Sequence, residues 1–268
     1  RDAADATAVM SHSPGACELL PNRKYRAKTS EGEAHWLKAS HAVQNPADGT
    51  LRKNLPLGDA SDPYTSIYLN KNVQDWWRLV REDLIDPAGQ EARDKAKKEG
   101  KKVIEDNPDE TDFKQFVIVM QQAKALHDFI DEKFHPDTFA HYAADAKQQA
   151  WNEVNWWCDD VVSGEALTAS LLKDNLNGTI TLGIDGKKRR FKIPDGQGPG
   201  DGTVPAESGA APTPFVKQIF KHEGRAKKHT SYDHQFSYNA DIVQASVLYS
   251  ICRMVADSEW TAANLHRA

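Results

Sequence analysis

An acidic residue flanked by two glycines is the sharpest chemical feature of this sequence. Asp201 stands in the run GDGTVP of residues 200–205, at the end of a loop that begins at Pro194. Glycine lets the backbone turn tightly and leaves no side chain beside the acid. We therefore predict that Asp201 projects its carboxylate from a turn, where it can hold a partner side chain. The plainer alternative is an aspartate that serves only the turn.

A histidine on a later loop is the candidate partner for this acid. His234 lies in the run YDHQFSYN of residues 232–239, directly before a stretch with helical periodicity at 241–256. A histidine on a loop that a helix anchors can present one ring nitrogen while a carboxylate holds the other. Acid first and histidine second is the chain order of the last two members of a Ser-Asp-His triad.

Neighbouring residues offer alternatives for both roles. Two further histidines and two further acids lie in the same region: His222, His229, Asp195 and Glu207. Asp233 stands directly before His234 and is better suited to capping the loop than to holding the imidazole. The motifs favour Asp201 and His234.

Several segments together resemble a known family. The GDGTVP run and the HQxxYN pattern of residues 234–239 are similar to the lipase and acyltransferase branch of the α/β-hydrolases. Residues 13–22, SPGACELLPN, look like the start of the lid region in that branch. With HPDTFAHY at 135–142 and Ile193-Pro194, the chain most resembles the C-terminal half of an antibacterial phospholipase effector of the type VI secretion system.

The resemblance implies a serine-type lipid esterase, similar to a phospholipase, that works through an acyl-serine intermediate and needs no cofactor. In that mechanism Asp201 holds the imidazole, and His234 acts as general base and then as general acid. The resemblance also implies a lipid ester substrate, an immunity protein that blocks the site, and a secretion-system adaptor or carrier. Such an effector is made in the cytoplasm and delivered to the periplasm of a target cell without a signal peptide, and no signal-peptide pattern is visible here.

The nucleophile of such a triad is missing. No Gly-x-Ser-x-Gly pattern occurs in the 268 residues. Ser13, in the run SHSPG of residues 11–15, is the nearest candidate. The residue after the serine must supply an N–H to the oxyanion hole, and Pro14 has none. We therefore expect the serine to lie before Arg1, in an N-terminal part of the same polypeptide, and this chain alone to be inactive.

Two other functions stay open at this point. A hydrolase-derived domain without turnover, which docks a carrier, an adaptor or an inhibitor, would explain the missing serine. A triad that passes the acyl group to an acceptor other than water would make the protein an acyltransferase.

Weaker patterns suggest other binding sites. The glycines of residues 196–202 are compatible with a phosphate cradle, but no helix is expected after them and Pro205 follows instead. His135, Asp137 and His141 are of metal-ligand types, but their spacing fits no standard motif, so we expect no metal site.

Two surface patterns bear on contact with lipid. The basic run Lys187–Arg190 is expected as a solvated strand surface, with contact to anionic headgroups of a membrane as the alternative. The pair Trp76 and Trp77 is expected in a buried cap helix, with a lid that meets an acyl chain as the alternative.

Composition limits the classes of protein that remain. Hydrophobic residues make up 39% of the chain and charged residues 27%, as in globular proteins. The longest apolar run, Phe116–Met120, is far shorter than the roughly 18 residues that cross a bilayer. The net charge of −5 argues against a nucleic-acid partner. Three widely spaced cysteines encode neither a disulfide framework nor a zinc site, and leave room for one disulfide.

The resemblance and the hydrophobic pattern together predict an α/β fold, the C-terminal part of an α/β-hydrolase with a large, mainly helical cap or lid. Residues 1–134 are expected to form this cap, and residues 135–268 the last strands, the acid loop, the histidine loop and a closing helix. The predicted elements are helices at 73–84, 112–134, 148–160 and 241–256, a strand at 138–142, and a hairpin at 178–193 that turns at Asp185-Gly186.

Overall fold

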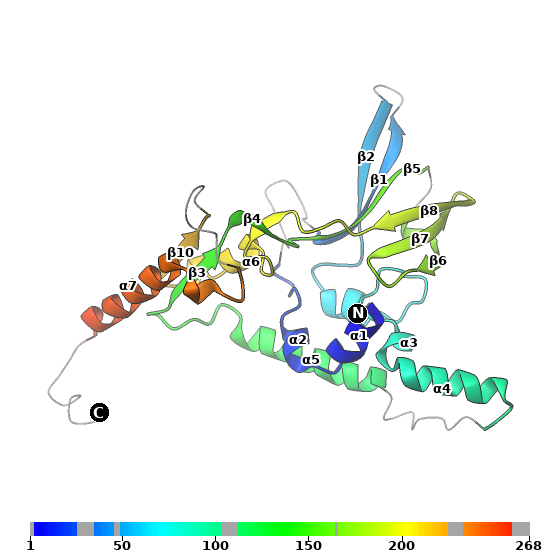
Figure 1. Cartoon of the computed structure of the whole chain (residues 1–268), viewed down its shortest axis with the longest axis horizontal. Helices are drawn as coiled ribbons and strands as arrows, with labels where there is room; N and C mark the ends of the chain where they lie inside the picture. The colour runs from blue at the N-terminus through cyan, green and yellow to red at the C-terminus, as the bar shows by residue number, and fades with distance from the viewer. Residues whose placement is uncertain are drawn as a thin grey trace. The chain divides into compact units, whose positions relative to one another are not determined.

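The chain folds into two compact units in a computed structural model (Figure 1). Unit 1 comprises Arg1–Asp131 and Glu153–Pro194, and unit 2 comprises Glu132–Asn152 and Asp195–Ala268. The structure describes residues 3–25, 35–45, 49–102, 112–163, 166–224 and 233–258. Both units combine strands with helices, so the predicted α/β class is confirmed.

A six-stranded sheet forms the centre of unit 1. Its strand order is β2-β1-β5-β8-β7-β6, and all neighbours are antiparallel except β1 and β5, which are parallel. The strands are β1 (Leu37–Asn45), β2 (Gly49–Pro56), β5 (Val154–Val161), β6 (Ser170–Asp174), β7 (Thr179–Ile184) and β8 (Lys187–Lys192).

The helices of unit 1 lie on one side of this sheet (Figure 1). They are α1 (Ala3–Met10), α2 (Pro14–Glu18), a π-helical turn (Tyr64–Tyr68), α3 (Glu82–Ile85), α4 (Pro87–Lys98), α5 (Asp112–Ile130) and a 3₁₀ turn (Ala166–Thr168). The apolar stripe of α5 buries Phe113, Phe116, Met120 and Ala123 in a core shared with the sheet. Burial of this one face holds the helix in place, because tertiary packing rather than propensity stabilises most helices.

The predicted hairpin is confirmed. Strands β7 and β8 pair along their whole length around Asp185 and Gly186. Both turn residues have positive φ, 55° and 69°, as a two-residue hairpin of type I′ requires.

Two predicted helices are wrong. Residues 148–160 form strands β4 and β5 instead, with Val154, Trp156 and Cys158 alternating toward the core of unit 1. Residues 73–81 form turns, and a helix begins only at Glu82. Trp76 is nonetheless buried as expected, and its indole N–H donates to the Ala166 carbonyl at 3.0 Å.

The division into units also differs from the predicted boundary at residue 134. Residues 153–194, expected in the second part, belong to unit 1 because β5 pairs with β1 and thereby joins β6–β8 to β1 and β2. Within residues 1–134 the described part has more helix than strand, and it also contributes β1 and β2 to the sheet. Whether it acts as a cap stays a prediction.

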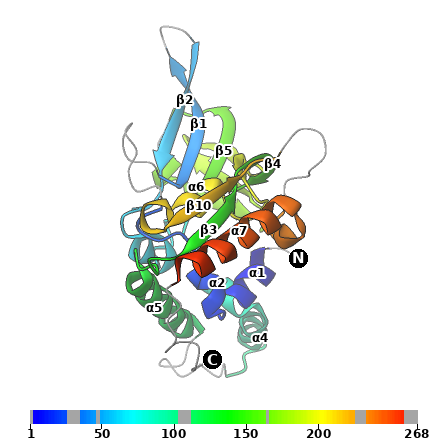
Figure 2. The ribbon, with the colours of Figure 1, turned by 90° about the vertical axis from the view of Figure 1, so that its left-hand side faces the viewer.

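Unit 2 is built on two small sheets (Figure 2). Strands β3 (Phe139–Ala143) and β10 (Gln218–His222) pair in parallel, and β4 (Asp145–Ala150) and β9 (Gly198–Gly200) pair antiparallel. Helix α6 (Ala206–Ala210) and 3₁₀ turns at Thr213–Phe215 and Ser237–Asn239 complete it with α7 (Asp241–Asp257), the predicted closing helix. Helix α7 lies along β3 and β10, and its Val243 packs against Ala143.

Two further properties concern the described residues only. Cys17, Cys158 and Cys252 carry free thiols, so the disulfide that the sequence left open is not formed. No helix in the described ranges is both long and apolar enough to span a bilayer.

Two histidines, the buried His222 and the partly buried His141, lie in the packing of α7 against the parallel strands. The rings of His141 on β3 and His222 on β10 are 5.8 Å apart, and His222 Nε2 is 3.3 Å from the Ser246 hydroxyl of α7. Burial lowers the pKa of both histidines, and the proximity of His141 lowers that of His222 further. The unfolded chain therefore binds protons at a higher pH than the folded one.

We predict that the protein loses stability as the pH falls below the ordinary histidine pKa of about 6.5, because unfolding then takes up protons. The midpoint of thermal unfolding should be lower at about pH 5.5 than at about pH 7.5, and the His222→Gln substitution should reduce this difference. His135→Gln, at an exposed position of the same unit, is the matched control. Equal drops in the wild-type protein and the His222→Gln variant would contradict the assignment.

Candidate active site

Asp201 sits in a tight turn directly after β9. Its N–H donates to the Val204 carbonyl at 3.3 Å, and Gly200 forms an isolated β-bridge with Pro205, which closes the loop. The neighbouring Gly202 N–H donates to the Gln148 carbonyl of β4 at 3.2 Å. The turn is thus fixed both within itself and to the adjacent strand.

Both flanking glycines are required by this geometry. A Cβ on Gly200 would lie 2.4 Å from the Val204 carbonyl oxygen, and Gly202 has a φ of +90°. The first position has no room for a side chain, and the second has a backbone conformation that L-residues rarely adopt. The sequence GDG is therefore the local cause of the turn that presents Asp201.

Hydrogen bonds fix the Asp201 carboxylate on both oxygens. Oδ1 accepts from the backbone N–H groups of Thr203 at 2.9 Å and Val204 at 2.7 Å. Oδ2 is 2.9 Å from Nδ1 of His234. The side chain is only 12% exposed, so these bonds are largely screened from solvent and hold one orientation.

His234 is attached to the acid at two points. Besides the ring contact, its backbone N–H donates to the Asp201 carbonyl at 2.8 Å. Asp233 accepts from the Phe236 N–H at 2.9 Å and so caps the turn that leads into α7, as expected. The His234 side chain is 54% exposed, whereas the carboxylate that it meets is nearly covered.

This arrangement sets the chemistry that the imidazole can perform. A carboxylate that accepts from Nδ1–H leaves the lone pair on Nε2. Nε2 makes no hydrogen bond to any residue in the described ranges. The neutral ring can therefore take a proton at Nε2, and the adjacent carboxylate stabilises the cation that forms.

The other sequence candidates lie elsewhere. His222 is on β10 against Ser246, and His229 falls outside the described residues. Asp195 lies in the loop before β9, and Glu207 in the first turn of α6. The helix α6 itself corrects the sequence analysis, which expected no helix after Pro205.

Ser13 has a conformation unlike that of a strained nucleophile turn. It is the N-cap of α2 in unit 1, with φ −107° and ψ 104°, and Pro14 is the first residue of that helix. Its carbonyl accepts from the N–H groups of Ala16 and Cys17, so the residue serves the start of the helix.

Of the three residues of metal-ligand type, His135 and Asp137 contact each other, and the His141 ring contacts those of His222 and Tyr238. Asp137 pairs with Lys217 at 2.8 Å, and its backbone N–H donates to His135 Nδ1 at 3.1 Å. Within the described ranges, no group of three or more histidine, cysteine, aspartate or glutamate residues has a geometry that could hold a metal ion.

Sequence reasoning missed the groups that hold the acid. The N–H groups of Thr203 and Val204 and the Gln148 carbonyl are backbone atoms, whose positions depend on the turn and on the pairing of β4 with β9. The only signal in the sequence was indirect, because a short GDG turn brings the next N–H groups back to the aspartate.

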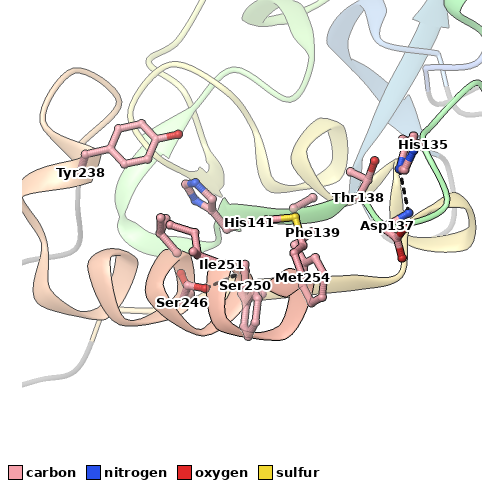
Figure 3. Close-up of a pocket in the computed structure, with 13 residues that line it drawn as sticks. His135, Asp137, Thr138, Phe139, His141, Tyr238, Ser246, Ser250, Ile251 and Met254 are labelled. Carbon is pink, nitrogen blue, oxygen red and sulfur yellow. Dashed lines mark hydrogen bonds between the residues drawn. The ribbon is translucent and has the colours of Figure 1, made fainter. Parts of the chain in front are cut away.

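A separate cavity of about 440 Å³ lies in unit 2 between β3, β10 and α7 (Figure 3). Its apolar wall includes Phe139 and Phe220 from the strands and Val247, Ile251 and Met254 from the helix. His141 lines it as well, next to the aromatic ring of Tyr238.

Comparisons with known proteins give one solved structure that resembles the chain. No protein-family model and no curated protein matches. The chain is similar to a protein in the crystal structure of the Tle4–Tli4 complex, with a TM-score of 0.66 and 28% sequence identity. The match covers 97% of this chain and 49% of that protein, so the chain spans about half the length of its structural neighbour.

Proposed function

We propose that the chain carries the acid and the base of a serine esterase that hydrolyses a lipid ester. The observation that carries this proposal is the contact of 2.9 Å between the enclosed Asp201 carboxylate and Nδ1 of the more exposed His234. The nucleophilic serine is supplied by an N-terminal part of the same polypeptide. Asp201 orients the imidazole, and His234 transfers the protons.

The reaction proceeds in two half-reactions. His234 Nε2 takes the proton from the serine hydroxyl as its oxygen attacks the ester carbonyl, and the Asp201 carboxylate stabilises the resulting imidazolium. The tetrahedral intermediate collapses when the C–O bond to the leaving alcohol breaks, and Nε2 returns the proton to that alcohol. Nε2 then takes a proton from water as the water oxygen attacks the acyl-serine carbonyl. When this second intermediate collapses, the bond to the serine oxygen breaks and Nε2 returns the proton to that oxygen, which releases the fatty acid and restores the serine.

The proposed substrate class rests on the resemblance. The motifs at residues 200–205 and 234–239 are similar to those of type VI phospholipase effectors, and the solved neighbour belongs to the Tle4–Tli4 complex. We infer that the substrate is a phospholipid of the target-cell envelope, reached by type VI delivery into the periplasm. A dedicated immunity protein is the proposed inhibitory partner, and a secretion-system adaptor or carrier the proposed means of delivery.

The N-terminal part of the polypeptide has a candidate docking surface on unit 2. Apolar side chains of α7 are exposed although they line or border the cavity described above, among them Ile251 and Met254. Parallel strands such as β3 and β10 are normally covered on both faces. The solved neighbour has about as much chain outside the match as inside it. These observations support an upstream segment that covers this surface.

We predict that Asp201→Asn and His234→Ala each lower kcat of the full-length protein on a lipid ester by about 10⁴-fold, the scale expected when a triad loses its acid or base. Asp195→Asn, in the loop before β9, is the matched control and should keep wild-type turnover. The three variants should unfold at similar temperatures, because His234 is half exposed and the asparagine can still accept backbone N–H bonds. Near wild-type turnover by either triad variant would refute the assignment.

A second prediction concerns the docking surface. In the full-length protein, hydrogen peroxide should oxidise Met254 several-fold more slowly than Met10 of α1, because the upstream segment covers the α7 surface. Peptide mass spectrometry measures both rates, with urea-unfolded protein as the reference. Equal rates in the folded protein would show that α7 stays uncovered.

A further inference from the structure

One face of the unit 1 sheet carries an unneutralised row of positive charges. On the opposite face, Ile180 and Leu182 of β7 and Phe191 of β8 are buried in the core. The register pairs Lys188 with Gly183, Arg190 with Thr181 and Lys192 with Thr179. Because alternate residues of a strand point to opposite faces, the three basic side chains of β8 project together from the face away from the helices.

These charges, like that of Lys187 at the start of β8, have no acidic partner in the described ranges. Lys188, Arg190 and Lys192 are exposed, and none forms an ion pair with a residue in the described ranges. Lys173 of β6, which the register places opposite Thr181, likewise has none.

Two cations elsewhere on the same sheet are neutralised locally. Arg189, on the core side of β8, pairs with Asp160 at 3.3 Å, and Lys38 of β1 pairs with Glu153 at 2.8 Å. Lys173, Lys188, Arg190 and Lys192 thus place four unpaired cations on one face of a chain whose net charge is −5. Lys188, Arg190 and Lys192 lie about 7 Å apart along β8 and therefore repel one another. An anionic surface outside the chain would bind them favourably.

Apolar groups accompany the charges on this face. Leu172 of β6 is 51% exposed, and its side chain lies over Gly183, since a Cβ on that glycine would be 3.3 Å from Leu172 Cδ1. Trp157 of β5 lies opposite Lys192, with the guanidinium of Arg52 3.6 Å above its ring centre. Side chains with an apolar body and a polar edge are typical of surfaces that meet the interface of a bilayer.

We propose that this face, defined by Lys173, Lys188, Arg190, Lys192 and Leu172, docks the protein on an anionic lipid bilayer. The cations bind the phosphate groups of the lipids, and Leu172 enters the interfacial layer. The proposal goes beyond the esterase function and does not depend on it, because none of its residues belongs to the Asp201–His234 pair. The exposed leucine among the cations favours a lipid surface over a nucleic acid, which would offer that side chain no apolar layer.

Vesicle cosedimentation tests the proposal on the full-length protein. We expect binding to vesicles of phosphatidylcholine mixed with phosphatidylglycerol and little binding to phosphatidylcholine alone. The triple variant Lys188→Glu, Arg190→Glu, Lys192→Glu should lose affinity by at least about fivefold for each charge. The triple variant Lys95→Glu, Lys97→Glu, Lys98→Glu makes the same charge change at the end of α4 and is the matched control, expected to bind as wild type.

Additional measurements separate folding and catalysis from docking. If charge reversal unfolds the sheet, the milder variant Lys188→Gln, Arg190→Gln, Lys192→Gln removes the same charges, and it should also bind the anionic vesicles more weakly than wild type. Asp201→Asn should bind vesicles normally, and the charge-reversal variant should still hydrolyse a soluble short-chain ester if the esterase proposal holds. The docking proposal is overturned if both vesicle types bind equally, if the β8 variants bind as well as wild type, or if duplex DNA binds this face more tightly than the vesicles do.

Discussion

The candidate site depends on the hydrogen bonds that enclose the Asp201 carboxylate. One oxygen is occupied by two backbone N–H groups of its own turn, which leaves the other to accept from the histidine ring. A carboxylate held on one side only could rotate, and the ring would lose its fixed tautomer and direction. The glycines at 200 and 202, the bridge to Pro205 and the contact with β4 all serve to hold this one group.

The two units differ in the features that they carry. In unit 2, short strands and α7 support the acid turn and the histidine loop, with His141 and His222 in the packing. In unit 1, a mixed sheet buries one face against helices and leaves cations and a leucine on the other. A lipid-directed enzyme needs both a reactive pair and a means of staying at an interface. The proposals assign the first task to unit 2 and the second to unit 1.

The sequence alone predicts features that depend on local chemistry. The hairpin at Asp185-Gly186, helix α5, the closing helix and the pairing of Asp201 with His234 all follow from turn residues, periodicity or chain order. Residues 148–160 mislead because Trp151, Val154 and Trp157 have helical spacing, while Val154, Trp156 and Cys158 alternate as in a strand. Pairing of β5 with β1 decides between these patterns, and such a long-range contact leaves no local signal. For the same reason, the sequence did not indicate that residues 153–194 belong to unit 1.

Labelling with a fluorophosphonate probe, followed by peptide mapping, would show whether His234 serves a nucleophilic serine, because the probe reacts with a serine that a working base has activated. We expect labelling of the full-length protein at one serine before Arg1, loss of that labelling in His234→Ala, and no labelling of the 268-residue chain alone. Labelling at Ser13, labelling that persists without the His234 imidazole, or a full-length protein that takes up no probe would contradict the account.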